Sequence, residues 1–211
     1  MNHFRNRTHA GQLLARALSA YKQRAGTIVL GIPRGGVVVS AEIARALGAP
    51  LDIFIAHKIG APFNSELAIG AVTSDGTVYL DEFLIRELSL TEAQVARARE
   101  TQMREIERRT ALYRRNRPAP ALKNKIVILA DDGIATGATT MAALRALKQH
   151  KPQRIILAAP VAPPQVMPML RAECDEAIVL ETPDPFMAVG YFFDEFDQVT
   201  DEQVIALLHS H

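Results

Sequence analysis

Residues 127–140 read V-I-L-A-D-D-G-I-A-T-G-A-T-T, and this stretch decides the fold class of the chain. Its four apolar residues, 127–130, predict a buried strand of a parallel sheet. Small and hydroxyl residues follow at 135–140 and run directly into a helical pattern that begins at Met141. In an open α/β sheet, such a strand–loop–helix junction lies at the carboxyl ends of the strands, where ligands bind.

The same junction carries groups that suit a sugar phosphate. A helix N-terminus presents unpaired backbone N–H groups and the positive end of the helix dipole, which together bind phosphate. The hydroxyls of Thr136, Thr139 and Thr140 add possible donors. The carboxylates of Asp131 and Asp132 would repel a phosphate, but they suit sugar hydroxyls or a hydrated Mg²⁺. The stretch therefore predicts a site for a sugar phosphate.

Residues 127–139 also resemble the signature of the type I phosphoribosyltransferases, which use phosphoribosyl pyrophosphate (PRPP). That signature has four apolar residues, an acidic pair, two apolar residues, and then small and hydroxyl residues around a glycine. Gly133 departs from the pattern, because an apolar residue usually stands there. The resemblance implies that Asp131 and Asp132 hold the ribose. It also implies that the 5-phosphate is bound by Ala135, Thr136, Gly137, Ala138, Thr139 and Thr140.

A second loop follows the first expected strand on the same edge of the sheet, with the sequence G-I-P-R-G-G at 31–36. Phosphoribosyltransferases have a pyrophosphate loop at this place, and many hold a cis non-proline peptide in it. On this resemblance Arg34 supplies charge, while Gly35 and Gly36 let backbone amides approach the pyrophosphate. An ordinary tight turn at a helix start is the alternative. Lys58, expected at the end of the second strand, is the second cation, unless it is a surface lysine.

The aromatic-rich segment 182–194 resembles the part of hypoxanthine-type members in which a ring stacks on the purine. The alternative is burial in a small C-terminal subdomain. The resemblance places Asp194 near Mg²⁺ and pyrophosphate, so the expected metal site combines it with Asp131 and Asp132. The residues expected to bind the acceptor are Phe186, Met187, Val189 and Tyr191.

Strand and helix patterns alternate along most of the chain and indicate one domain over residues 1–211. This alternation predicts an α/β fold with a doubly wound parallel sheet of about five strands. Residues 182–211 are expected to form a hood and a C-terminal helix. The expected strands are 27–30, 51–56, 127–130, 154–159 and 177–180, and the expected helices are 8–23, 37–47, 137–150 and 164–172.

Residues 58–120 interrupt this alternation and are expected to form a lid. They contain a probable hairpin, 67–72 and 77–80, turned by 74–76, and a long Arg-rich helix over 91–116. Thr91 and Gln94 have the spacing of a capping box at its start. The helix is either solvated and stabilised by charge pairs, a dimer contact, or a lid that presents Arg to pyrophosphate. Because the core strands lie outside it, we expect 90–116 to be removable without loss of the folded core.

The composition excludes several other classes of protein. The 211 residues are 48% hydrophobic and 22% charged, which are globular values. The net charge of +1 argues against a broad nucleic-acid surface. A single cysteine, Cys174, indicates a reducing compartment, and no apolar leader or membrane-length segment is visible. We therefore expect a cytoplasmic protein that does not bind a membrane.

The resemblance implies a Mg²⁺-dependent transfer of the 5-phosphoribosyl group of PRPP to a nitrogenous acceptor, with release of pyrophosphate. Asp131, Asp132, Arg34 and Lys58 are the expected catalytic residues, and a homodimer is expected. The acceptor stays open, because Ala135 stands where hypoxanthine–guanine enzymes have Asp. The main alternative is a non-catalytic regulatory protein that senses PRPP or a nucleotide. An RNA-binding regulator is disfavoured by the near-neutral charge.

Overall fold

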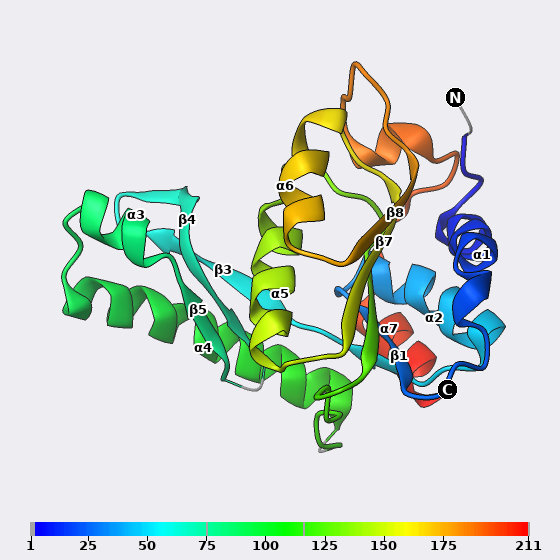
Figure 1. The fold of residues 1–211 in the computed structure, drawn as a ribbon, viewed down its shortest axis with the longest axis horizontal. Coiled ribbons are helices and arrows are strands. Elements are labelled where there is room, and N and C mark those ends of the chain that lie inside the picture. The colour runs from blue at the N-terminus through cyan, green and yellow to red at the C-terminus, as the bar shows by residue number, and fades with distance from the viewer. Residues whose placement is uncertain (1–2, 75, 116, 211) are drawn as a thin grey trace.

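The computed structural model describes residues 3–74, 76–115 and 117–210, without the side chains of Ser65 and Glu66. Asp75, in the expected hairpin turn, and Asn116, at the expected end of the long helix, lie outside the described residues. Figure 1 shows a central sheet with helices on both faces and an arm, formed by the insertion, that extends to one side.

Five parallel strands form the central sheet in the order β2-β1-β6-β7-β8. This sheet confirms the predicted fold class. Every residue of β1 and β6 is buried, as expected for central strands that are covered on both faces. The strands are β1 (Thr27–Gly31), β2 (Leu51–Ile53), β6 (Ile126–Ala130), β7 (Arg154–Val161) and β8 (Glu176–Glu181).

Two groups of helices cover the sheet and build a separate apolar core on each face. One face carries α1 (Arg7–Ala17), α2 (Gly35–Leu47) and α7 (Asp201–His209), with the short helix η1 (Ser19–Tyr21) after α1. The other carries α5 (Ala138–Gln149), η2 (Pro164–Val166) and α6 (Met167–Ala172). The first helix ends earlier than predicted, since α1 stops at Ala17 and the chain then tightens into η1.

The order of the strands defines where ligands can bind. After β1 the chain turns outward to β2, and β6 returns on the other side of β1. The carboxyl ends of β1 and β6 therefore flank the topological switch point, at which open α/β sheets bind their ligands. The G-I-P-R-G-G loop follows β1, and the acidic pair follows β6, so both predicted loops meet there.

The second predicted strand is wrong in its length. It splits into β2, which ends at Ile53, and β3 (Ala56–Ala61), which belongs to another sheet. β3 pairs antiparallel with β4 (Asn64–Thr73), which pairs in turn with β5 (Val78–Leu80). Lys58 therefore lies inside β3 and does not end a core strand. No glycine or proline interrupts the run from Leu51 to Ile59 to reveal the change of sheet.

The Arg-rich helix α4 (Glu92–Arg114) has the predicted capping box, in which N of Gln94 donates to Oγ1 of Thr91 at 3.3 Å. It follows a short helix, α3 (Glu82–Glu87), that the sequence did not suggest. Charge pairs such as Glu100–Arg104, at 2.7 Å, line its outer face as predicted for a solvated helix.

The opposite face of α4 belongs to the core, so the premise that the helix can be removed is wrong. Ile106 and Tyr113 are 0% and 1% exposed within the same apolar cluster as α1, α2 and α7. Arg114 is also buried, and its Nε donates to Oδ1 of Asp52 on β2 at 3.2 Å. Deleting the helix would expose this cluster and leave the Asp52 carboxylate without its arginine.

No helix in the described part of the chain is long and apolar enough to cross a membrane.

Candidate active site

The acidic pair lies at the carboxyl end of β6, where the sequence predicted it. Oδ1 of Asp131 accepts a hydrogen bond from N of Asp132 at 2.9 Å. Burial raises the pKa of Asp131 well above its usual value, and the neighbouring Asp132 carboxylate raises it further. Asp132 is paired instead with Arg7, whose Nε donates to Oδ2 at 2.6 Å. The two adjacent carboxylates thus have different surroundings.

The glycines of the G-I-P-R-G-G loop pack directly on this acidic pair. A Cβ atom on Gly35 would overlap Oδ2 of Asp132. A Cβ atom on Gly36 would lie 2.9 Å from the carbonyl O of Ala130 and 3.0 Å from Oδ1 of Asp131. These positions require glycine because the two loops touch, and they bring the expected pyrophosphate and ribose groups together. The Pro33–Arg34 peptide is cis.

Arg34, the charged residue of this loop, lies near the Asp201 carboxylate, which also binds a tyrosine from the insertion helix. Its Nη1 lies 3.7 Å from Oδ1 of Asp201, the first residue of α7. The same oxygen accepts a hydrogen bond from the hydroxyl of Tyr113, on α4, at 2.6 Å. Burial, together with the bond to Asp201, raises the pKa of Tyr113 to about 12. The phenol therefore stays a donor at neutral pH, and Asp201 connects the loop to both helices.

The expected 5-phosphate loop forms the start of α5. Gly137 precedes the helix with φ +77°, a conformation that favours glycine, and no side chain caps the helix there. Oγ1 of Thr136 accepts from N of Ala138 at 3.4 Å. The side chains of Thr136 and Thr139 are exposed, whereas Thr140 is only 2% exposed. The loop thus offers backbone amides and two accessible hydroxyls.

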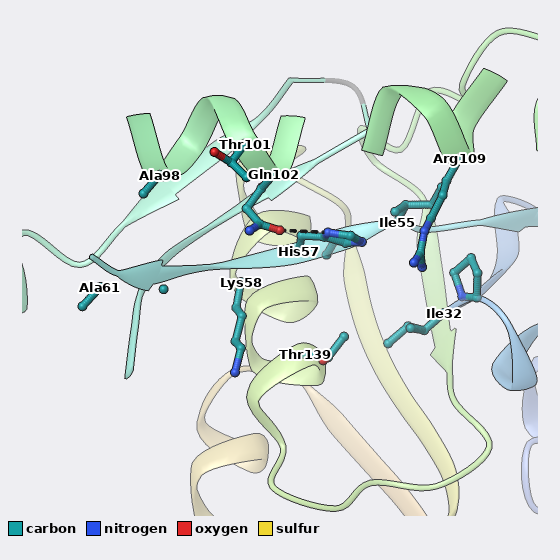
Figure 2. Close-up of a pocket in the computed structure, with 13 residues that line it drawn as sticks. Ile32, Ile55, His57, Lys58, Ala61, Ala98, Thr101, Gln102, Arg109 and Thr139 are labelled. Carbon is teal, nitrogen blue, oxygen red and sulfur yellow. Dashed lines mark hydrogen bonds between the residues drawn. The ribbon is translucent and has the colours of Figure 1, made fainter. Parts of the chain in front are cut away.

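A cavity of about 510 Å³ lies between this loop and the insertion. Ile32 and Pro33 line it on one side, Thr139 on another, and β3 and α4 complete it. Figure 2 shows Arg109 extending from α4 toward Ile32, and Lys58 extending from β3 on the side of Thr139. The cavity therefore brings two cations from the insertion to the edge that carries the phosphate loops.

His57 lines the same cavity and is held by the insertion helix. Its Nδ1 forms a 3.1 Å hydrogen bond with Oε1 of Gln102, on α4 (Figure 2). Burial lowers the pKa of His57, although the bond to Gln102 opposes the shift, and the nearby Arg109 lowers it further. His57 is therefore neutral at pH 7, and the fixed positive charge of the cavity comes from its lysine and arginine.

The predicted acceptor segment covers the acidic loop through Val189, which opens the short helix η3 (Val189–Phe192). A Cβ atom on Gly133 would overlap Cγ1 of Val189. This contact explains why glycine replaces the apolar residue of the family pattern at this position. The ring of Phe186 stacks on Phe192 with centroids 5.4 Å apart, whereas Met187 and Tyr191 are 70% and 67% exposed.

Asp194, the third expected metal residue, is exposed, and its Oδ1 lies 3.0 Å from Nδ1 of His3. No group of three or more His, Cys, Asp or Glu side chains that could hold a metal ion occurs among the described residues. The role of Asp194 at a metal therefore stays a prediction.

A family model described as "phosphoribosyl transferase domain" matches residues 6–189 of the chain. The chain belongs to the phosphoribosyltransferase family. This membership confirms the resemblance that the signature suggested.

The chain is similar to other proteins over most of its length. The crystal structure of TT1426 from Thermus thermophilus is 42% identical and has a TM-score of 0.92, covering 100% of this chain and 99% of that one. A Mycobacterium tuberculosis H37Rv protein with the provisional name of phosphoribosyl transferase is 38% identical over 208 residues. The match covers 99% of this chain and 47% of that protein, so the chain spans about half the length of the curated relatives it matches. A purine phosphoribosyltransferase from Pyrococcus horikoshii is 16% identical, with a TM-score of 0.48 and 90% of both chains covered.

The sequence did not reveal three residues of the candidate site. Arg7 gives no local signal, because it lies at the start of the first helix, far along the chain from Asp132. Arg109 and Gln102 belong to α4, whose many arginines were visible, but whose inward face was not. The few bulky apolar residues, Val95, Ile106 and Tyr113, recur on one face of the helix, but they do not show what that face packs against.

Proposed function

We propose that this family member transfers the 5-phosphoribosyl group of PRPP to a nitrogenous acceptor and releases pyrophosphate. One observation carries the proposal: the acidic pair, the glycine loop and the start of α5 meet at the switch point between β1 and β6. Each of the three suits a different part of PRPP.

The proposed roles follow from the chemistry of each group. The carboxylates of Asp131 and Asp132 accept hydrogen bonds from the ribose hydroxyls. Backbone amides and hydroxyls of residues 135–140 hold the 5-phosphate. Arg34, Lys58 and the amides around Gly35 and Gly36 hold the pyrophosphate. Cleavage of the anomeric C–O bond leaves negative charge on the pyrophosphate, which these fixed cations and dipoles stabilise.

A Mg²⁺ ion fits the donor set, because adjacent carboxylates are hard oxygen ligands. Oδ2 of Asp132 is already bound by Arg7, so the protein would supply few oxygens, and the substrate and water would supply the others. Asp131 and Asp132 would hold the ion, and Asp194 is proposed to lie near it. When bound, the ion would neutralise charge on the departing pyrophosphate.

We further propose that residues 58–120 act as the lid that keeps water from the reacting sugar.

Hypoxanthine and guanine are expected to be poor acceptors. Ala135 cannot manage the purine N7 proton, and general acid–base help is worth about 10²–10⁴ in rate. The strand end at 159–163 reads A-P-V-A-P and offers no lysine to the 6-oxo group. Steady-state assays with both bases should give kcat/KM below about 10⁴ M⁻¹s⁻¹. A higher value for either base would contradict this prediction.

Replacing Arg109 is expected to weaken PRPP binding. Arg109→Gln removes a cation from the cavity that adjoins the pyrophosphate loop, and KM for PRPP should rise about tenfold. Arg109 also pairs with Glu105 at 2.6 Å, and Arg104→Gln is the matched control on the same helix, since Arg104 pairs with Glu100 in the same way but is 76% exposed. Steady-state kinetics at saturating acceptor compare the two variants. Equal KM values for both would show that Arg109 does not contribute to PRPP binding.

Two measurements test the proposed function. Calorimetry with PRPP, with and without Mg²⁺, tests binding, and a screen of nucleobases and other amines for PRPP-dependent pyrophosphate release tests transfer. Binding together with release supports the enzyme. Binding without release by any acceptor supports the alternative, a PRPP sensor on the same fold, and no binding refutes both. A cytoplasmic location and a homodimer remain further proposals.

A further inference from the structure

A buried arginine from the first helix holds the second carboxylate of the signature. Arg7 opens α1, directly after Asn6 caps the helix by accepting a 3.0 Å hydrogen bond from N of His9. Nε of Arg7 donates to Oδ2 of Asp132 at 2.6 Å, and the two side chains are only 12% and 18% exposed. The partners are 125 residues apart in the chain, so the contact is made by the tertiary fold.

The segment after η3 fixes the Arg7 guanidinium from two further directions. Nη1 donates to the carbonyl O of Asp197 at 2.7 Å. Cζ lies 3.7 Å from the centre of the Phe196 ring, which is the geometry of a cation–π contact. This segment is tied to the chain before α1, because N of Glu195 donates to O of Arg5 at 2.9 Å. Arg7 cannot turn away from Asp132 without breaking several of these contacts.

Arg7 also lies where the two ligand-binding loops touch. The Cβ position of Gly35 that overlaps Oδ2 of Asp132 is 2.7 Å from Nε of Arg7. Stability alone is a weak reason for such a pair, because the cost of burying two charges often cancels their attraction. The guanidinium fork divides its donors, with Nε on the Asp132 carboxylate and Nη1 on the Asp197 carbonyl, so it fixes the carboxylate relative to the segment 194–197, which a single point charge cannot do.

We propose that Arg7 is the positioning residue of the acidic pair, holding the Asp132 carboxylate in the orientation that receives the ribose hydroxyls of PRPP. Arg7 acts through Asp132 and does not itself touch the substrate. The inference rests on the proposed function, because it concerns the same ribose site. It adds that the first helix and the segment 194–197 are part of the machinery that prepares this site.

Calorimetry with PRPP and Mg²⁺ tests the inference on Arg7→Gln, Arg7→Lys and Arg114→Gln. Arg7→Gln is expected to raise the Kd by about 10- to 100-fold, the usual effect of losing a residue that orients a ligand-binding group. Arg7→Lys keeps a charge but not the fork, so its Kd should lie between those of Arg7→Gln and the unaltered chain. Arg114→Gln breaks a comparably buried pair, 8% and 18% exposed, which involves Asp52 on the edge strand β2, with β1 between it and β6. It should lower the thermal unfolding midpoint and leave the Kd unchanged.

A double-mutant cycle with Asp132→Asn separates positioning from a general structural role. If Arg7 acts through Asp132, adding Arg7→Gln to Asp132→Asn should change the Kd by no more than about twofold. A full additive loss would overturn the inference, as would an unchanged Kd for Arg7→Gln alone. Failure of the unaltered chain to bind PRPP would overturn both the proposed function and this inference. Binding by the unaltered chain, with an unchanged Kd for Arg7→Gln, would overturn the inference alone, so the two failures are distinguishable.

Discussion

Asp131→Asn combined with Asp132→Asn is expected to weaken PRPP binding by roughly a hundredfold or more, since each hydrogen bond to a charged group contributes about 1.5–3 kcal/mol. Both carboxylates lie at the carboxyl end of β6 against the glycine loop. Calorimetry measures the loss. Asp52→Asn is the control, because Asp52 is a carboxylate on the edge strand β2 that is paired with Arg114 and does not contact the acidic pair through any described hydrogen bond. Unchanged affinity in the double variant would refute the ribose assignment.

Folding stability is expected to respond to Asp131→Asn in the opposite sense from PRPP binding. Burial raises the pKa of Asp131 above its unfolded value, so the unfolded chain binds fewer protons than the folded chain at intermediate pH. Ionisation of Asp131 therefore lowers folding stability as pH rises above the ordinary range of a carboxyl group. Asp131→Asn removes this cost, and the unfolding midpoint at pH 7 should be maintained or raised while PRPP binding falls. Such an opposition of stability and binding is typical of functional residues.

Gly35→Ala is the second change from which a large effect is expected. The added methyl group would overlap the Asp132 carboxylate that Arg7 holds, and one of the three groups has to move. Because the pyrophosphate loop and the ribose carboxylate are both displaced, we expect the Kd for PRPP to rise by roughly a hundredfold. Calorimetry and thermal unfolding on the same samples measure binding and stability.

Gly26→Ala provides the matched control for that change. Gly26 has φ +79° with nothing within 4 Å of its Cβ position, so alanine there brings strain without a collision. This strain costs about 1–2 kcal/mol of stability. PRPP binding by Gly26→Ala should be unaffected. If Gly35→Ala binds PRPP as tightly as Gly26→Ala does, the contact between the loops does not contribute to PRPP binding.

The core of the fold could be predicted because its signals are local. Strands buried on both faces are continuous apolar runs, and β1, β6 and β7 all show them. The acidic pair and the glycine loop are each a continuous motif that directly follows a core strand. Their meeting at one edge of the sheet could therefore be predicted from the expected parallel strands. The phosphate loop at 135–140 is placed at the start of α5 for the same reason.

The remaining features depend on contacts between distant segments. The step from β2 to β3 leaves no mark in the sequence, because a strand that changes sheets keeps the same apolar composition. The burial of Tyr113 and Arg114 at the end of a polar helix depends on Asp201 and Asp52, which lie on other elements. The pairing of Arg7 with Asp132 likewise requires the first helix to lie beside the end of β6. No periodicity or local motif encodes these neighbours.

The packing of Val189 on Gly133 has a consequence for how this branch of the family can change. The two positions form one steric unit, since the hood side chain fills the space that a Cβ atom at position 133 would need. A chain with the usual apolar residue at the signature position must have a smaller side chain, or a more distant backbone, at the hood position. Glycine at position 133 and valine at position 189 are therefore complementary. An apolar side chain introduced at position 133 alone would collide with Val189, and a smaller side chain introduced at position 189 alone would leave a cavity.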